Sequence, residues 1–284
     1  MYTIHEAFLK AKKRLADAGI ADAGFDAAKI IEKHTGYKRH EILLYGEKPL
    51  CCPDDEFWSD VERRAKHEPL QYIFGKWPFF GLDFFVGKGV LIPRPDTEVL
   101  CEVAISYLSE KPSPKILDLC AGSGCISTAI LKNVENSTAV CVELSDDALY
   151  YLKKNIDFHG LKERAEIVKG DVLANETLDS LAFDFDAIVC NPPYINSGDI
   201  PALEPEVAEY EPITALDGGE DGLLFYRSAG RFLPHLKNGG FAAFEVGAGQ
   251  SDDVSRILEN SGYRDIFIKK DYAGIERVVG GFSK

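Results

Sequence analysis

The sequence lacks any apolar run long enough to cross a membrane, and its mean hydropathy is -0.12. A spanning helix needs about 20 consecutive apolar residues. The 284 residues are 45% hydrophobic and 27% charged, which is typical of a soluble globular protein and excludes a disordered or collagen-like chain. The length exceeds the roughly 100 to 200 residues of one typical domain. We therefore expect two compact units, or one large α/β unit with an appendage, and no membrane partner.

Basic residues are scarce as well. The chain has 32 Lys and Arg against 46 Asp and Glu, a formal net charge of -14. Residues 1–87 hold 13 basic and 14 acidic residues, whereas residues 88–284 hold 19 and 32. Affinity for nucleic acid comes largely from Lys and Arg that displace counterions from phosphates. The second part of the chain is therefore not expected to bind a long polyanion.

Cysteine and histidine occur without the spacing of a disulfide framework or a metal site. The seven cysteines are an odd number, no C-x-x-C pair occurs, and the six histidines do not cluster with cysteines. The first twenty residues carry charges where a secretory signal would need an unbroken apolar run. We expect no metal and a cytoplasmic location.

Short helical patterns dominate the beginning of the chain. Thr3 and Glu6 have the spacing of a capping box, and apolar residues recur at steps of four, three and four from Ile4 to Leu15. Gly19 is expected to end this helix. Similar patterns at about 22–34, 38–45 and 54–67 predict a small helical bundle over residues 1–72.

Aromatic residues are dense from Tyr72 to Val86, and Gly81-Leu82 separates two aromatic runs. This pattern predicts a β-hairpin within a linker over residues 73–90. Large apolar side chains usually serve burial, so we attribute these aromatic residues to core packing.

Residues 91–284 alternate apolar runs typical of strands with helical stretches, which predicts an α/β domain with a parallel sheet covered on both faces. The predicted strands are 115–119, 139–142, 165–168, 185–190, 240–246, 266–269 and 276–279. The predicted helices are 95–109, 124–133, 146–159, 221–234 and 250–260.

A glycine-rich turn follows the first of these strands. Residues 116–124 read ILDLCAGSG, a buried strand that leads directly through Gly122 and Gly124 into a helix. This geometry brings a ligand close to backbone at a helix N-terminus. A structural turn remains an alternative, and a third glycine of the dinucleotide fingerprint would fall at Ser127, which weakens a nicotinamide interpretation.

Acidic residues follow the next two strands. Glu143 ends the second strand, nineteen residues after Gly124, where an acidic side chain binds the hydroxyls of a ribose. Asp171 follows the third strand, where a carboxylate can accept from an adenine amino group. Either acid alone could be a helix N-cap or part of a solvated loop. The three strand ends together favour an adenosine-containing ligand.

The tetrapeptide Asn191-Pro192-Pro193-Tyr194 follows the strand 185–190. Two prolines fix φ and remove both backbone donors, so the segment presents acceptors, an amide and an aromatic ring. The Asn191 side-chain oxygen and the Pro192 carbonyl can each accept one hydrogen of a planar NH2 group. Tyr194 would pack against that group while Pro193 holds the register. A stiff turn without chemistry is the alternative.

With these motifs the chain resembles the class I methyltransferases that use S-adenosylmethionine, and among them the protein-glutamine methyltransferases of the HemK/PrmC type. The resemblance covers nearly the full length and includes 91–98, 118–124, 143, 191–194, 211–223 and 271–277. Three positions depart from the family pattern: Cys120-Ala121 stands where Gly-Thr is more common, Asp96 replaces Glu, and Glu143 replaces Asp. None of them upsets the resemblance, because the loop acts through its backbone and the charges are kept.

The resemblance implies a Rossmann-like seven-stranded sheet over 91–284 and a substrate-recognition domain over 1–72. It implies S-adenosylmethionine as cofactor, with S-adenosylhomocysteine as product, and the Gly-Gly-Gln glutamine of class I peptide chain release factors as substrate. The protein is expected to act as a monomer. The expected cofactor-binding residues are Asp118, Cys120, Ala121, Gly122, Ser123, Gly124, Glu143, Asp171, Val172 and Asn191. The expected substrate-binding residues are Asn191, Pro192, Pro193, Tyr194 and Arg94, of which Asn191, Pro192 and Tyr194 are expected to be catalytic.

Three questions stay open at this point. Arg94 either belongs to a lid over the cofactor or fixes a loop through backbone carbonyls. Adenine in DNA or RNA also carries a planar NH2 group, but residues 196–226 hold eight acidic residues and no Lys or Arg, which disfavours an approaching phosphate strand. A catalytically silent module that binds an adenosine ligand is the third interpretation, which the motifs taken together disfavour.

Overall fold

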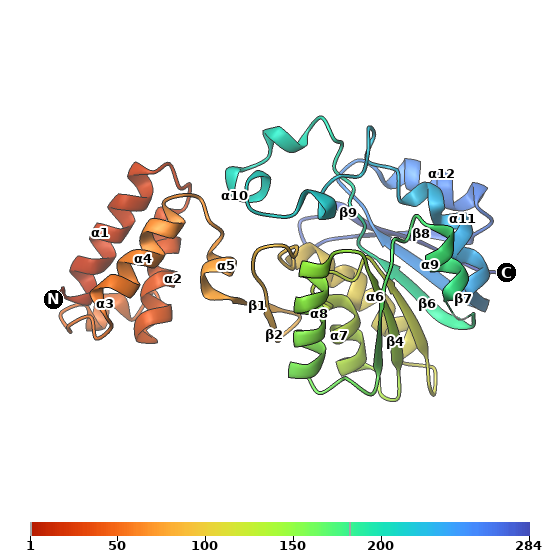
Figure 1. Cartoon of the computed structure of the whole chain (residues 1–284), viewed down its shortest axis with the longest axis horizontal. Helices are drawn as coiled ribbons and strands as arrows, with labels where there is room; N and C mark the ends of the chain where they lie inside the picture. The colour runs from red at the N-terminus through yellow and green to blue at the C-terminus, as the bar shows by residue number, and fades with distance from the viewer. Residues whose placement is uncertain (1, 182) are drawn as a thin grey trace. The chain divides into compact units, whose positions relative to one another are not determined.

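The structure is a computed structural model that describes residues 2–181 and 183–284. The chain divides into two compact units (Figure 1). One unit comprises Met1–Gly75 and Glu204–Tyr210, and the other comprises Lys76–Leu203 and Glu211–Lys284. None of the helices in the described ranges combines the length and the apolar character of a membrane span.

The first unit is a helical bundle. Its first five helices are α1 (Ile4–Asp17), α2 (Ala23–Thr35), α3 (Ile42–Tyr45), α4 (Asp54–Arg64) and α5 (Leu70–Phe74). Helix α1 begins at the predicted capping box, since the Thr3 hydroxyl accepts from the Glu6 backbone and the Glu6 carboxylate accepts from the Thr3 backbone. The buried residues of α1 recur every three or four positions and join α2 and α4 in one core.

The segment Glu204–Tyr210, which contains α10 (Pro205–Ala208), is part of this helical unit despite its distance in sequence. The buried Arg64 guanidinium donates to Asp26 Oδ2 at 2.6 Å and forms an ion pair with Glu206 Oε2 at 2.5 Å. The Tyr210 hydroxyl donates to the Lys66 carbonyl at 2.5 Å. These contacts attach the segment to the C-terminal end of α4.

The predicted hairpin consists of β1 (Lys76–Phe79) and β2 (Leu82–Phe85), which pair in antiparallel fashion. Phe80 and Gly81 both have positive φ, 51° and 72°, as a two-residue type I′ turn requires. Phe79 and Phe84 are buried in the core of the second unit with their ring centroids 6.0 Å apart. These two aromatic residues therefore serve packing, as predicted.

The second unit contains a seven-stranded sheet in the order β5-β4-β3-β6-β7-β9-β8. Its strands are β3 (Lys115–Leu119), β4 (Thr138–Glu143), β5 (Ala165–Lys169), β6 (Phe185–Cys190), β7 (Leu236–Glu245), β8 (Arg264–Lys270) and β9 (Glu276–Phe282). All seven overlap the predicted strands. The predicted parallel pairing holds for β3 to β7, whereas at one edge β9 runs antiparallel to both β7 and β8. The short turn between β8 and β9 cannot form the crossover that a parallel pair needs.

Helices cover both faces of this sheet (Figure 1). On one face lie α6 (Glu98–Leu108), α7 (Cys125–Asn133) and α8 (Asp146–Phe158). On the other lie α9 (Asn175–Ser180), α11 (Ala229–Phe232) and α12 (Ser251–Asn260). Strand β3 illustrates the alternation, because Ile116 joins the first core and Leu117 and Leu119 join the second.

Short 3-10 turns interrupt the helical stretches of the second unit. They are η1 (Pro95–Thr97), η2 (Ile200–Ala202), η3 (Ile213–Ala215), η4 (Tyr226–Ser228) and η5 (Leu233–His235). The predicted helix 221–234 is thus divided into η4, α11 and η5. Pro234 has no backbone donor, which explains why the regular helix stops before it.

Candidate active site

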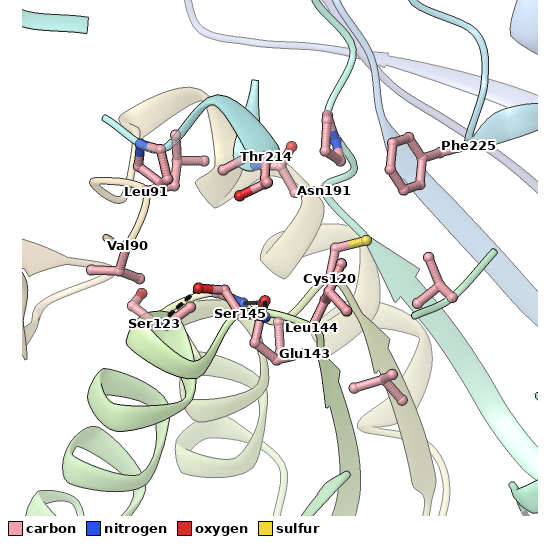
Figure 2. Close-up of a pocket in the computed structure, with 18 of the residues that line it drawn as sticks. Val90, Leu91, Cys120, Ser123, Glu143, Leu144, Ser145, Asn191, Thr214 and Phe225 are labelled. Atoms are coloured by element: carbon pink, nitrogen blue, oxygen red, sulfur yellow. Dashed lines mark hydrogen bonds between the residues drawn. The ribbon is translucent and has the colours of Figure 1, made fainter. Parts of the chain in front are cut away.

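A cavity of about 510 Å³ lies in the second unit at the carboxyl ends of the parallel strands. It opens where the strand order reverses between β3 and β6, the position at which α/β sheets bind ligands. Figure 2 shows Asn191, Thr214 and Phe225 on one side of this cavity and Ser123, Glu143 and Ser145 on the other. The two motifs that the sequence singled out therefore share one cavity.

The cavity wall includes many of the residues predicted from the sequence. Those that line it are Arg94, Cys120, Ala121, Gly122, Ser123, Glu143, Asp171, Val172, Asn191 and Pro193. Asp118, Gly124, Pro192 and Tyr194 are not part of the lining; the last three directly adjoin it in the sequence, and Asp118 lies two positions before Cys120.

The glycine turn depends on backbone conformations that favour glycine. Gly122 and Gly124 have φ of 56° and 77°, and Cys120 also has a positive φ of 60°. The turn closes through a hydrogen bond of 2.8 Å from the Gly124 amide to the Ala121 carbonyl. A Cβ atom on Gly124 would come within 2.5 Å of the Leu152 side chain in α8. Gly124 therefore permits both the turn and the close packing of α8 against it.

Glu143 is held rigidly against this turn. Its Oε2 accepts from the Gly122 amide and its Oε1 from the Ser145 amide, both at 2.8 Å. A carboxylate has about four acceptor positions, so two backbone bonds leave capacity for a ligand's hydroxyl groups. The carboxylate of Glu143, whose place at the end of β4 suggested ribose binding, is thus held in a fixed orientation at the cavity wall.

Asp118 lies beneath the turn and is fully buried. Its Oδ2 accepts from the Ser127 amide at 3.2 Å, near the N-terminus of α7, and its Oδ1 has no hydrogen-bond partner in the part of the chain that the structure describes. Burial raises the pKa of Asp118 to about 7, and the hydrogen bonds from Ser127 offset this only in part. Asp118 thus fixes the start of α7, which directly follows the glycine turn, through its bond to the Ser127 amide.

Asp171 follows β5 and lines the cavity beside Val172. Its Oδ1 accepts from the Leu173 amide at 2.8 Å, which fixes the carboxylate on its own turn. Asp171 and Glu143 place two carboxylates on this part of the cavity wall. The apolar residues Val142, Leu144 and Val172, at or just after the ends of β4 and β5, line the same part.

Asn191 extends from β6 into the cavity wall, and its Nδ2 donates to the Thr97 hydroxyl at 3.3 Å. Tyr194 is directed elsewhere, because its hydroxyl donates to Glu245 Oε1 at 3.4 Å. Burial and the neighbouring Glu245 carboxyl raise the pKa of Tyr194. The tyrosine remains a neutral donor across the physiological range.

Arg94 lines the cavity and forms an ion pair with Glu211, which is buried. Glu211 Oε2 also accepts from the Ile92 amide at 3.1 Å. The segment before η1 is thereby bound to the chain that leads into η3, and both segments contribute to the cavity wall. The acidic run noted in the sequence thus contains one residue that fixes the neighbourhood of Arg94.

Three residues of this region, Thr97, Glu211 and Glu245, are not among the site residues predicted from the sequence. Thr97 lines the cavity, whereas Glu245 ends β7 and is buried behind Asn191 and Tyr194. An acidic residue at the carboxyl end of a strand was the signal that identified Glu143, and it applies equally to Glu245. The predicted strand ended one residue later and so concealed it.

Asp96 is bound to the last hairpin of the sheet. Arg277 Nη2 forms an ion pair with Asp96 Oδ2 at 3.0 Å, while Arg277 Nε donates to Asp271 Oδ2 at 2.9 Å. The described residues contain no group of three His, Cys, Asp or Glu side chains arranged to hold a metal ion.

The strand order, the cavity and the family comparisons define the class of this protein. A model of the methyltransferase small domain matches residues 97–205. A methyltransferase from Pyrococcus furiosus shares the fold, with a TM-score of 0.52 at 17% identity over 72% of this chain and 90% of that one. The second unit therefore has the α/β fold of a methyltransferase.

Full-length relatives define the family more narrowly. The release factor glutamine methyltransferase of Geobacter sulfurreducens is 39% identical over 99% of this chain and 97% of its own length, and that of Agrobacterium fabrum is 37% identical over 98% and 96%. A model of the PrmC N-terminal domain matches residues 6–75. The chain belongs to the release factor glutamine methyltransferase family.

Proposed function

We propose that this enzyme transfers a methyl group from S-adenosylmethionine to the side-chain amide nitrogen of the glutamine in the Gly-Gly-Gln motif of class I peptide chain release factors. The observation that carries this proposal is the single cavity lined by both the glycine turn and Asn191. Full-length similarity to release factor glutamine methyltransferases supports the choice of substrate.

The cavity fits S-adenosylmethionine in size and in chemistry. Its volume of about 510 Å³ is that of a small-molecule site. Glu143 would hold the ribose hydroxyls and Asp171 the adenine amino group, while the apolar residues of the same wall would contact the adenine ring. The bound cofactor would supply an electrophilic methyl group on a positively charged sulfur. The carboxylates of the wall favour such a cation, because opposite charges attract strongly where water is excluded.

The residues of β6 would act on the substrate amide. An amide nitrogen is a poor nucleophile because its lone pair is delocalised into the carbonyl group. The Asn191 Oδ1 and the Pro192 carbonyl would accept its two hydrogens, and these bonds strengthen as positive charge develops on nitrogen. As the nitrogen takes the methyl group, S-adenosylhomocysteine would leave, and one of the two N–H protons would then pass to water to give the neutral N-methyl amide. Interactions that strengthen only in the transition state accelerate the reaction, by roughly 2 to 4 kcal/mol each if they resemble single oxyanion-hole donors. Proximity in the cavity supplies a further part of the acceleration.

Mass spectrometry of a class I release factor tests this proposal. The factor is incubated with the purified enzyme and S-adenosylmethionine carrying a labelled methyl group, and the peptide with the Gly-Gly-Gln motif is sequenced. We expect one labelled methyl group on the glutamine and none in a factor whose motif glutamine is replaced by alanine. Label transferred to DNA or RNA instead, or to no acceptor, would contradict the proposal.

A further inference from the structure

A buried carboxyl group behind Asn191 has no part in the chemistry described so far. Glu245 ends β7 and is 1% exposed. Its Oε1 accepts from the Tyr194 hydroxyl, but its Oε2 has no hydrogen-bond partner within the described ranges. Burying a carboxyl group with an unmatched oxygen costs free energy, so its presence in a native fold calls for a specific explanation.

Thr97 lies between this carboxyl group and Asn191. Thr97 is 2% exposed, and its hydroxyl group lies near enough to the Glu245 carboxyl group to lower the pKa of that group. Its Oγ1 also accepts from Asn191 Nδ2 at 3.3 Å. The three side chains therefore form a chain of polar groups that runs from the interior to the cavity wall.

The protonation state of Glu245 sets the direction of every bond in this chain. An ionised carboxylate only accepts, so a neighbouring hydroxyl group such as that of Thr97 directs its single hydrogen toward it. The Thr97 oxygen then offers only lone pairs to Asn191 and must face the NH2 end of its amide. The Oδ1 end of Asn191 consequently turns to the other side, where the proposed mechanism needs an acceptor.

We propose that Glu245 and Thr97 are positioning residues that select the amide orientation of Asn191 in which its oxygen faces the substrate. This inference rests on the proposed function for its substrate but concerns an orientation that can be observed in the free enzyme. A carboxamide has nearly the same shape in its two orientations, so packing alone selects poorly between them, whereas a neighbour that can only accept selects strongly.

The orientation should depend on pH. Burial raises the pKa of Glu245 to about 7, with Thr97, the Arg277 cation and Tyr194 lowering it and Asp96 raising it. The other titratable groups that sense this carboxyl group are Cys101, Cys125, Cys190 and Tyr226, whose pKa values burial raises. A protonated Glu245 can donate to Thr97, and the fixed direction of the bonds is then lost. We expect kcat to rise with pH toward a plateau above about pH 7.

Three variants test the inference by activity. Thr97→Val keeps the shape of the side chain but removes the hydroxyl, Thr97→Ser restores it, and Glu245→Gln imitates the neutral carboxyl group. For Thr97→Val we expect kcat to fall about 10- to 100-fold, the range known for partners that orient metal ligands. KM and cofactor affinity should change less than about threefold. Thr97→Ser should recover most of kcat, and Glu245→Gln should lose the rise of kcat with pH.

Side-chain NMR of Asn191 supplies a readout that does not need turnover. The Nδ2 signals are assigned by their loss in Asn191→Asp. In the unsubstituted enzyme they should shift with a midpoint near pH 7, and this shift should be absent in Glu245→Gln and in Thr97→Val. Unchanged kcat in Thr97→Val, an equal loss in Thr97→Ser, or a pH-dependent shift that survives in Glu245→Gln would overturn the inference. An inactive enzyme that still shows the shift would contradict the proposed function alone.

Discussion

Asn191 is the side chain on which the proposed chemistry depends most directly. It comes from β6, lies in the wall of the cavity and contacts Thr97, while the neighbouring Tyr194 is held by Glu245. At the scale of single residues, the site combines preorganised acceptors at the wall with buried carboxyl groups behind it. Their contributions can be separated by substitutions that act on one group at a time.

Substitution of Asn191 should remove catalysis while the cofactor site is preserved. In Asn191→Ala one of the two acceptors for the substrate amide is lost, so we expect kcat to fall by at least about 100-fold. The dissociation constant of S-adenosylmethionine, measured by calorimetry, should stay within a few-fold. Asn196→Ala provides the control, because Asn196 follows the same strand but is not part of the cavity lining. An active Asn191→Ala enzyme would remove the mechanism.

The buried carboxyl group of Asp118 should make stability depend on pH. Its pKa is raised from 3.8 to about 7, so the folded protein binds a proton that the unfolded chain releases. The free energy of unfolding should therefore decrease as pH rises from about 4 to 7, where this contribution is lost. Asp118→Asn keeps an acceptor for the Ser127 amide but cannot ionise. Urea unfolding at a series of pH values should show a smaller decrease for this variant, and equal slopes would contradict the assignment.

At the scale of elements, the glycine turn joins three parts of the fold, namely β3, α7 and α8. Gly122 faces the cavity and Gly124 packs against Leu152 of α8. Both have positive φ, which strains any side chain, but only Gly124 also lacks room for one. The two glycines therefore have different tasks within the same short loop.

A pair of alanine substitutions separates these tasks. Gly122→Ala incurs only the backbone strain, about 1 to 2 kcal/mol, because the nearest atom is 4.0 Å from the added Cβ. Gly124→Ala adds the overlap with Leu152 at 2.5 Å, which should cost about 1 to 3 kcal/mol more. Urea unfolding should show the larger loss for Gly124→Ala, whereas cofactor affinity should fall more in Gly122→Ala. Equal stability of the two variants would contradict this division.

The elements were predictable where the signal was local. Continuous apolar runs located all seven strands, and the capping box located α1. The direction of β9 was missed because strand direction depends on pairing, not on composition. The partnership of Arg94 with Glu211 spans 117 positions, and no local pattern could indicate it. Glu245 was overlooked because it lies inside an apolar run, although its position at a strand end carries the same information as that of Glu143.

At the scale of the whole molecule, the chain passes between its two units three times, after Gly75, after Leu203 and after Tyr210. The segment between the last two crossings is attached to the helical unit through Arg64 and Tyr210. Arg64 is buried with Asp26, so its removal would leave a buried carboxylate without a cationic partner. The helical unit is thus completed by a piece of chain encoded far downstream of it.

A cut between Gly75 and Lys76 should for this reason leave the two fragments associated. We expect a protein with a protease site inserted there to elute as one species after cleavage, because Glu204–Tyr210 stays bound to α4. The same cut in Arg64→Ala should release the N-terminal fragment on size-exclusion chromatography. Separation of the fragments without the substitution would show that these contacts are too weak to hold the segment.

Because α10 belongs to the helical unit, domains of this protein cannot be exchanged with those of a relative at a single point in the sequence. A chimaera that exchanges only the first 75 residues between relatives would combine the bundle of one protein with the segment 204–210 of another. Arg64 and Glu206 would then each face residues from a different relative. Grafts that transplant residues 204–210 together with the bundle would keep this surface intact. The helical unit is therefore discontinuous in sequence, and a recombination point placed only after residue 75 would separate its two parts.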